Sequence, residues 1–422
     1  MHYSRTILPN GPRLITVPMK ESPTVTVLVL VEAGSKYESK KINGISHFLE
    51  HMCFKGTKRR PKPIDIVKEL DGIGAAYNAF TAQEMTGYYA KSDKKHFEKI
   101  LDVVADIYLH STLPEAEIEK EKGVIVEEIK MYNDLPPRHI HDVLMSGLYG
   151  DQAAGFDVAG TPETVRAVTS ETLHSYRQSH YLASATTVVV AGGITPAHAE
   201  THARKAFAAM PSGAKGAKAA VRERQAKPAL HIQRKKTDQV HLAFGIRTFD
   251  LHHENVPALR VLASALGGGM SSRLFQKMRD ELGICYYIGA SPEHFTDHGF
   301  LEITAGVQAA RLTEAVAAIL AEVRQLKDKP IGAVELARVK EYLCGTLHLG
   351  LESSDAVAEF YGFQDIVHKR LRRPDEVVAQ IRAVTASDVS HIAAKYLTDA
   401  NLNLAIIGAV DNKKEVEGLL HV

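Results

Sequence analysis

Two histidines and a glutamate between residues 43 and 56 have the types and the spacing that bind and activate a metal ion. His47 and His51 are four residues apart, and Glu50 directly precedes the second histidine. In a helix both imidazoles project from one face and can bind a single ion. Glu50 then lies on the same side, where it can take a proton from a water bound to that ion. The order reverses that of the common zinc-protease helix motif.

A third ligand would separate such a metal site from a pair of surface histidines on an amphipathic helix. The predicted helix 115–133 has a stripe of residues at the spacing of a buried face, and this stripe includes Glu121 and Glu128. Glutamates on an apolar stripe are costly to bury unless they are paired or bind a metal. Either one could be the third ligand while the other orients a histidine, or both could stay partly exposed. The neighbouring Glu127 is expected to face solvent.

The elements that must position these residues belong to an internal duplication. Leu70 and Gly87 recur as Leu282 and Gly299 at one constant interval, which is close to half the chain. Each copy contains a glycine-rich turn, a tyrosine-bearing or apolar strand and a following amphipathic helix. The duplication predicts two homologous αβ units of ordinary domain size.

Short strands and helices are mixed within each half, and several successive strands have no helix between them. The predicted strands of the first half are 14–18, 25–32 and 77–90. The predicted helices are 43–54, 63–70, 94–109 and 115–133. This mixture favours an α+β fold with two homologous halves, each an antiparallel-rich sheet flanked by helices, over a doubly wound parallel sheet.

A change in composition separates the two copies. Residues 210–228 are mostly small and basic and include almost no large apolar side chain, which is typical of a solvated linker. We therefore expect an N-terminal metal-binding domain at 1–209 and a C-terminal homologous domain at 229–422. The segment 256–269 corresponds to the metal helix in the second half and contains no histidine, so the metal is expected in the first domain.

Composition excludes several classes of protein. The chain has 422 residues, 45% of them hydrophobic, and 51 Lys and Arg balance 50 Asp and Glu. This balance gives no electrostatic reason to expect nucleic acid or an anionic membrane surface as a partner. No apolar run approaches the roughly 18 residues that cross a bilayer, and three cysteines are too few for a disulfide framework. With no signal-peptide core at the start, we expect a cytoplasmic location.

The sequence HFLEHM at 47–52, followed by FKGT at 54–57, resembles the signature of the pitrilysin and mitochondrial processing peptidase family. Members of that family are zinc metallopeptidases with the inverted motif, and the likeness covers nearly the whole chain. It implies that Glu128 completes the set of ligands for one Zn²⁺ per chain and that Glu121 orients a histidine. The ligand set also suits zinc better than manganese or cobalt.

The resemblance also assigns residues that handle the substrate. The family's edge strand, which pairs with the substrate backbone, is similar to four residues of this chain: Asn78, Ala79, Phe80 and Thr81. In the second half, the stretch 272–286 is similar to the family's arginine–tyrosine motif. That likeness implies that Tyr286, together with Arg279, donates to or anchors the substrate carbonyl.

The implied function is a zinc-dependent endopeptidase that hydrolyses peptides or unfolded segments bound as an extended strand, with Glu50 as the general base. Long members of the family close four such halves around a chamber. This chain has two, so a homodimer is expected to enclose the chamber, with Arg279 and Tyr286 lining it. Two other interpretations stay open: a non-catalytic structural subunit, which the intact motif opposes, and a processing subunit that works with a different family member.

Overall fold

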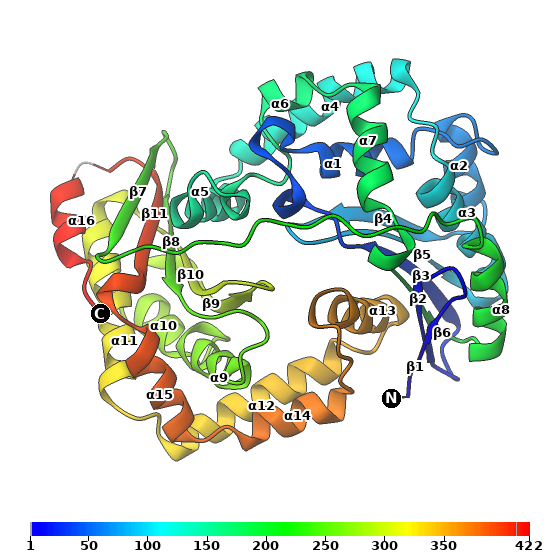
Figure 1. Cartoon of the computed structure of the whole chain (residues 1–422). Coiled ribbons are helices and arrows are strands. Elements are labelled where there is room, and N and C mark those ends of the chain that lie inside the picture. The colour runs from blue at the N-terminus through cyan, green and yellow to red at the C-terminus, as the bar shows by residue number, and fades with distance from the viewer. Residues whose placement is uncertain (1, 411) are drawn as a thin grey trace. The chain divides into compact units, whose positions relative to one another are not determined.

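A computed structural model describes residues 2–410 and 412–422 of the chain. The chain forms two compact units (Figure 1), each built on one β-sheet. The first unit consists of Met1–Lys130, Phe156–Ala219 and His348–Pro374. The second unit consists of Met131–Gly155, Ala220–Leu347 and Asp375–Val422.

The two sheets share one strand order of five strands, to which the first sheet adds β1. The first sheet runs β1-β2-β6-β3-β5-β4, with bounds β1(Ser4–Ile7), β2(Arg13–Pro18), β3(Thr24–Val31), β4(Ala76–Thr81), β5(Thr86–Asp93) and β6(Thr186–Gly192). The second runs β7-β11-β8-β10-β9, with bounds β7(Ala229–Arg234), β8(Val240–Arg247), β9(Cys285–His294), β10(Gly299–Val307) and β11(Leu402–Gly408). In each sheet one corresponding pair is parallel, β2 with β6 and β7 with β11, and the other pairs are antiparallel. The predicted α+β fold with two homologous halves is confirmed.

The helices follow the duplication as well. The first half contains α1(Ile45–Cys53), α2(Pro63–Asp71), α3(Phe97–His110), α4(Glu115–Asn133), α5(Pro136–Tyr149), α6(Pro162–Arg166), α7(Ser170–His180) and α8(Pro196–Ala206). The second half contains α9(Val256–Gly267), α10(Arg273–Phe275), α11(Leu312–Asp328), α12(Ala333–Leu349), α13(Ser354–Phe363), α14(Pro374–Ala383), α15(Ala386–Tyr396) and α16(Lys413–Leu419).

Both faces of each sheet are buried, which explains the nearly continuous apolar character of the central strands. In β3 every residue after Thr24 is buried. Alternate side chains of β3 enter two separate cores, one formed with α1 and α3 and the other with α13. The second sheet packs on α9 and α11 with one face and on α5 with the other.

Two of these covering helices come from the opposite half of the sequence. α5 lies in the second unit, where it packs on β8 and β11, and α13 lies in the first unit, where it packs on β3 and β6. The predicted domain boundaries at 209 and 229 follow the internal duplication of the sequence. The compact units differ from those domains, because α5 belongs to the second unit and α13 belongs to the first. Residues 211–228, all of which the structure describes, form neither helix nor strand.

One predicted element is wrong. The stretch 77–90 was expected as a single strand, but it forms a hairpin of β4 and β5 in which the Ala82 amide donates to the Met85 carbonyl at 2.8 Å. The reversal at 82–85 contains neither Gly nor Pro, so the residues that usually mark a turn are missing. Within the described part of the chain, no helix is both long and apolar enough to cross a membrane.

Candidate active site

The helix α1 is held at its start by a buried carboxylate. Gly44 precedes the helix with φ of 92°, and a Cβ there would come within 2.6 Å of the Ala159 carbonyl oxygen, so this turn requires glycine. Glu38 accepts hydrogen bonds from the backbone amides of Gly44 at 2.7 Å and Ser46 at 2.8 Å. A carboxylate at this end also suits the helix dipole.

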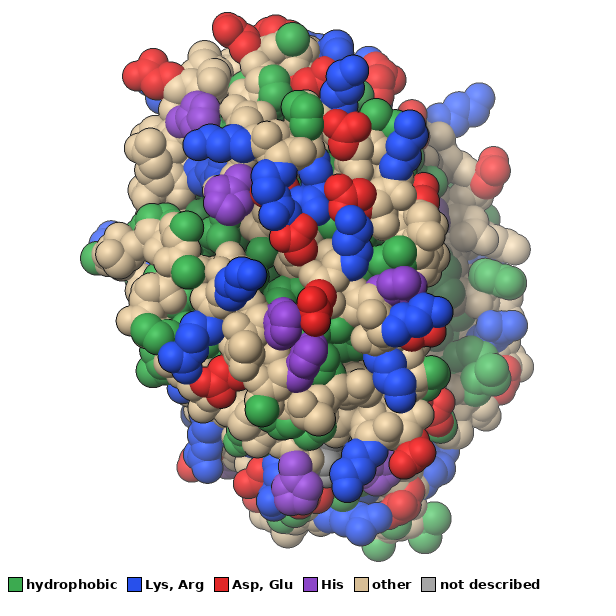
Figure 2. Space-filling model, turned by 90° about the vertical axis from the view of Figure 1, so that its right-hand side faces the viewer, with side chains coloured by type: hydrophobic (Ala, Val, Ile, Leu, Met, Phe, Trp, Pro, Cys, Tyr) green, Lys and Arg blue, Asp and Glu red, His purple; other side chains and the backbone are tan. Residues whose placement is uncertain are grey.

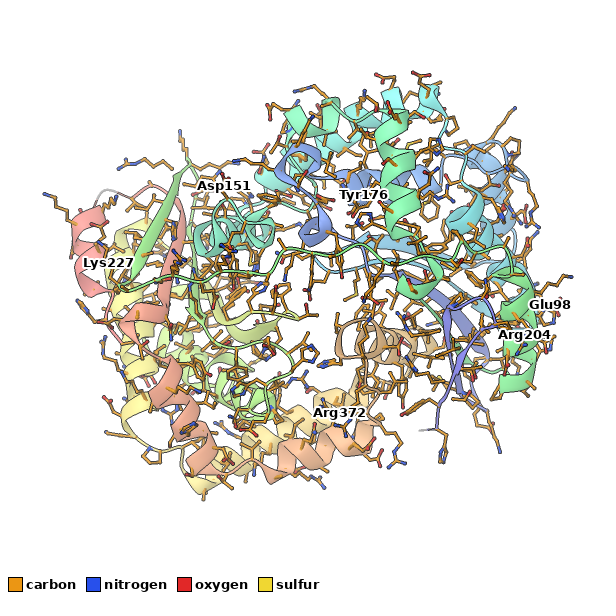
Figure 3. All side chains as sticks on the ribbon, viewed as in Figure 1. Glu98, Asp151, Tyr176, Arg204, Lys227 and Arg372 are labelled. Carbon is orange, nitrogen blue, oxygen red and sulfur yellow. The ribbon has the colours of Figure 1, made fainter. Side chains whose placement is uncertain are left out.

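The same helix is packed tightly into the first unit. Phe48, Leu49 and Met52 are fully buried in its core. The Ser46 hydroxyl lies 2.7 Å from the hydroxyl of Tyr176 on α7, and Figure 3 labels Tyr176 beside α1. The helix therefore has little freedom to rotate, and the direction of its histidines is fixed.

His47 and His51 from α1 converge with Glu128 from α4. The two Nε2 atoms are 3.2 Å apart. Glu128 Oε2 lies 3.7 Å from His47 Nε2 and 3.4 Å from His51 Nε2. The family resemblance predicted these three residues as one set, and the structure brings them together.

The spacing of these three atoms fits a zinc ion. Bonds of about 2.0–2.1 Å in tetrahedral geometry place neighbouring ligand atoms about 3.3 Å apart, close to the separations found between His47, His51 and Glu128. Two imidazoles and one carboxylate are also the ligand number of catalytic zinc sites, which keep a fourth position open. These residues can hold zinc without rearrangement of the backbone.

Glu121, one of the two candidate ligands on α4, instead contacts the far side of a histidine. Its Oε1 lies 2.8 Å from His51 Nδ1, and its Oε2 lies 2.6 Å from the ammonium of Lys55. Burial opposes a charge on His51, but hydrogen bonds to Glu121 and Glu128 outweigh this effect and raise the pKa of His51 to about 9. The contact turns His51 Nε2 toward Glu128 and makes the ring a strong base.

The carboxylate of Glu50 is buried next to this set. It accepts a hydrogen bond of 2.5 Å from the hydroxyl of Thr81 on β4. Burial raises the pKa of Glu50, and Glu128 adds to that rise, whereas Thr81 and His51 oppose it. A carboxylate with a raised pKa is suited to accept and return a proton near neutral pH.

The predicted substrate strand is the edge of the first sheet. β4 pairs with β5 on one side and is the last strand in the order. Asn78 and Ala79 lie in its middle, the Phe80 ring packs edge-on against Phe363 at 5.7 Å, and Thr81 bonds Glu50. The outer backbone edge of β4 thus ends beside the candidate base.

The predicted arginine–tyrosine pair lies in the second unit. Arg279 belongs to the π-helical turn η6(Gln276–Glu281), and Tyr286 belongs to the edge strand β9. Arg279 donates to the Tyr286 carbonyl at 3.1 Å, and its guanidinium lies 5.5 Å from the centre of the Tyr286 ring. The tyrosine side chain is 74% exposed, so its hydroxyl is accessible to a substrate.

Three contributions to the site were missed by sequence analysis: the cap from Glu38, the ion pair from Lys55 and the contact of Thr81 with Glu50. Thr81 was predicted only as part of the substrate strand. Glu38 gave no local signal, because the residues that usually cap a helix are Ser, Thr, Asp and Asn at the cap position itself, whereas Glu38 lies six residues before Gly44.

Models of known protein families match most of the chain. The model described as "Insulinase (Peptidase family M16)" matches residues 13–162, and the model described as "Peptidase M16 inactive domain" matches residues 167–343. The chain belongs to peptidase family M16. This assignment confirms the resemblance indicated by the motif at 47–52. The two models meet between residues 162 and 167, which lies inside the first half and before the predicted linker.

Relatives of similar length carry the name zinc protease. An uncharacterized zinc protease of Bacillus subtilis is 36% identical over 410 residues, which cover 96% of this chain and 97% of the relative. An uncharacterized zinc protease of Streptomyces coelicolor is 31% identical over 419 residues, 97% of this chain and 90% of the relative.

Solved structures share the fold of this family member. A protease from Helicobacter pylori has a TM-score of 0.88 at 22% identity and covers 97% of this chain and 99% of its own. A peptidase M16 inactive domain from Pseudomonas fluorescens has a TM-score of 0.89 at 18% identity, with 97% and 98% covered. At these identities the likeness supports the two-sheet fold alone.

Proposed function

We propose that this M16 family member is a zinc-dependent endopeptidase. The observation that carries the proposal is the convergence of His47, His51 and Glu128 at zinc-ligand spacing beside the buried carboxylate of Glu50. A structural subunit has no need to preserve such a set. The names of the relatives agree with this activity.

Glu50 is the proposed general base. When bound, zinc supplies Lewis-acid activation of the attacking water and of the scissile carbonyl. Glu50 accepts the proton as that water attacks and then delivers it to the leaving amine. The hydroxyl of Thr81 holds the Glu50 carboxylate in position, and Glu121 holds the ring of His51.

The proposed substrate is a peptide or an unfolded segment in extended form. It adds to the outer edge of β4 along Asn78, Ala79, Phe80 and Thr81. Main-chain hydrogen bonds dominate this mode of recognition and carry little information about side chains. Cleavage is therefore expected to depend more on an extended backbone than on a strict sequence.

Tyr286 and Arg279 are proposed to contact the substrate carbonyl. The exposed Tyr286 hydroxyl is a donor of the kind that stabilises developing negative charge, and Arg279 fixes the backbone beside it. We propose that two copies of the chain form a homodimer that encloses the substrate, as the family resemblance implies. Each chain contains both the metal set and this pair, so no second kind of chain is required.

The first experiment compares the wild type with Glu50→Gln. Hydrolysis of a quenched fluorescent peptide library and the bound zinc are measured for both proteins. We expect the wild type to hydrolyse peptides and the variant to lose at least about 100-fold in rate while it keeps its zinc, because Glu50 is not one of the three proposed ligands.

Two outcomes would contradict parts of the proposal in different ways. A wild-type chain that binds no zinc would favour a structural subunit. A zinc-loaded wild type without activity would indicate that a different family member must be added. The peptides that are cut would in addition give the preferences around the scissile bond.

A further inference from the structure

A second group of metal-binding side chains lies on α3 and α8 of the first unit. His198 and His202 are one turn apart on α8, which is the same step that separates His47 and His51 on α1. Pro196 begins this helix, and the Thr195 side chain caps it by accepting from the His198 amide at 3.4 Å. The backbone that bears His198 is therefore fixed.

The carboxylate of Glu98, from the first turn of α3, lies beside the Nε2 atoms of both imidazoles. Glu98 Oε1 is 3.5 Å from His198 Nε2 and 3.4 Å from His202 Nε2. The two rings stack at 4.5 Å. The Phe97 ring lies 5.6 Å from the ring of His198 and 6.1 Å from that of His202, and it limits the rotamers that both can adopt.

We propose that Glu98, His198 and His202 bind a second divalent transition-metal ion, such as Zn²⁺. One ligand atom from each residue lies within 4.8 Å of the others, so small rotations of the side chains would bring all three atoms within bonding distance of one ion. Two imidazoles and a carboxylate favour Zn²⁺ and neighbouring ions over Mg²⁺ or Ca²⁺, which prefer oxygen ligands.

The site is open to solvent, unlike the set around His47. The side chains are 63% exposed for Glu98, 46% for His198 and 31% for His202. Figure 2 views the side of the molecule on which α3 and α8 lie in Figure 1, and it shows histidine side chains gathered beside an acidic one. Water can complete the coordination of the ion, so its exchange should be faster than at a buried site.

The bound ion would link two helices. Glu98 comes from α3 and both histidines come from α8, and these helices pack against each other within the first unit. A metal that binds the native arrangement and not the unfolded chain stabilises the native state. The second site is therefore expected to raise the melting temperature without contributing a group to the reaction.

The test counts metal ions on the full chain. The protein is stripped with a chelator and titrated with Zn²⁺ against a coloured chelator of micromolar affinity. We expect the wild type to bind two ions, and the double variant His198→Ala/His202→Ala to bind one and keep its peptidase activity. Glu98→Gln retains both histidines and should weaken the binding of the second ion, because a neutral amide is a poorer ligand than a carboxylate.

Two further proteins make the test decisive. His174→Ala removes another exposed histidine, on α7, and should still bind two ions. His47→Ala/His51→Ala should keep the second ion, and zinc should still raise its melting temperature. The proposal would be overturned if the wild type bound only one ion, or if the variant His198→Ala/His202→Ala still bound two.

Discussion

Glu50 and Thr81 form the contact on which proton transfer in the proposed reaction depends. A carboxylate that must first meet the water and then the leaving amine needs a fixed orientation. The hydroxyl of Thr81 provides it at 2.5 Å, from a strand that is remote from Glu50 in the sequence. In the proposed function the same strand presents its outer edge to the substrate, so one element would align both the base and the peptide.

Replacing Thr81 tests this coupling. Thr81→Val removes the hydroxyl and keeps the shape, so we expect kcat to fall about 10-fold, the scale of one hydrogen bond to a charged group. Bound zinc should not change. Thr81→Ser keeps the hydroxyl and should restore most of the rate. Equal kcat values for Thr81→Val and the wild type in steady-state peptide hydrolysis would exclude an orienting role for Thr81.

Glu121 is expected to control zinc affinity through His51. It lies 2.8 Å from Nδ1 of that ring and is the buried member of the pair of glutamates on α4. Glu121→Gln should weaken zinc binding about 10–100-fold, the usual effect of losing the partner of a ligating histidine. A titration against a competing chelator measures the change.

The matched control is Glu119→Gln on the same helix. Glu119 is 63% exposed and pairs only with Lys122 among the ion pairs described, so its loss should leave zinc affinity unchanged. If both variants bound zinc like the wild type, the contact of Glu121 with His51 would have no role in holding the metal.

The residues of the site differ in how far the sequence could predict them. His47, Glu50 and His51 share one helix, and helical spacing alone places them together. Glu128 needed the family resemblance, because periodicity marked Glu121 equally well. Lys55 gave no signal, since it follows the end of α1 while its partner Glu121 lies on α4, and only tertiary packing joins them.

At the scale of elements, α1 shows how an irregular segment can position a catalytic helix. Glu38 lies six residues before Gly44, and the chain between them includes the short 3₁₀ turn Lys40–Ile42. Its carboxylate reaches back to the amides of Gly44 and Ser46. Local propensity does not encode a cap from a side chain so far before the helix. Sequence analysis therefore placed the helix correctly without finding its cap.

His294, at the end of strand β9, predicts that acid lowers the stability of the second unit. His294 lies on Phe249, near His253, Asp250 and Arg260. Burial lowers the pKa of His294 to about 4. The unfolded chain binds the proton near the ordinary value of about 6.5, so between these two values it binds more protons than the native state, and stability falls as pH falls.

Because of His294, the free energy of unfolding is expected to fall by about 2 kcal/mol between pH 7 and pH 5. His294→Gln cannot titrate in this range, so its stability should fall less with acid than that of the wild type. Urea unfolding at the two pH values measures the difference. The exposed His391 on α15 gives a control, His391→Gln, that should behave like the wild type. An unchanged acid dependence in His294→Gln would contradict the assignment.

At the scale of the whole molecule, the duplication predicted two sheets but not the exchange of α5 and α13. In β3 apolar residues fall on both faces, and this pattern indicates that the sheet is covered on both sides. It does not say which helix covers which face. Amphipathic helices of similar length are interchangeable at the level of pattern, so only tertiary packing decides between them.

Assembly gives the last prediction. In the proposed function, a homodimer of this 46.2 kDa chain encloses the extended peptide. Light scattering after size exclusion should therefore give about twice the chain mass. Activity per chain should fall on dilution below the dimer dissociation constant, because separated chains lose the enclosure. A protein that runs at the mass of one chain and keeps full activity per chain at every dilution would exclude the dimer as the active form.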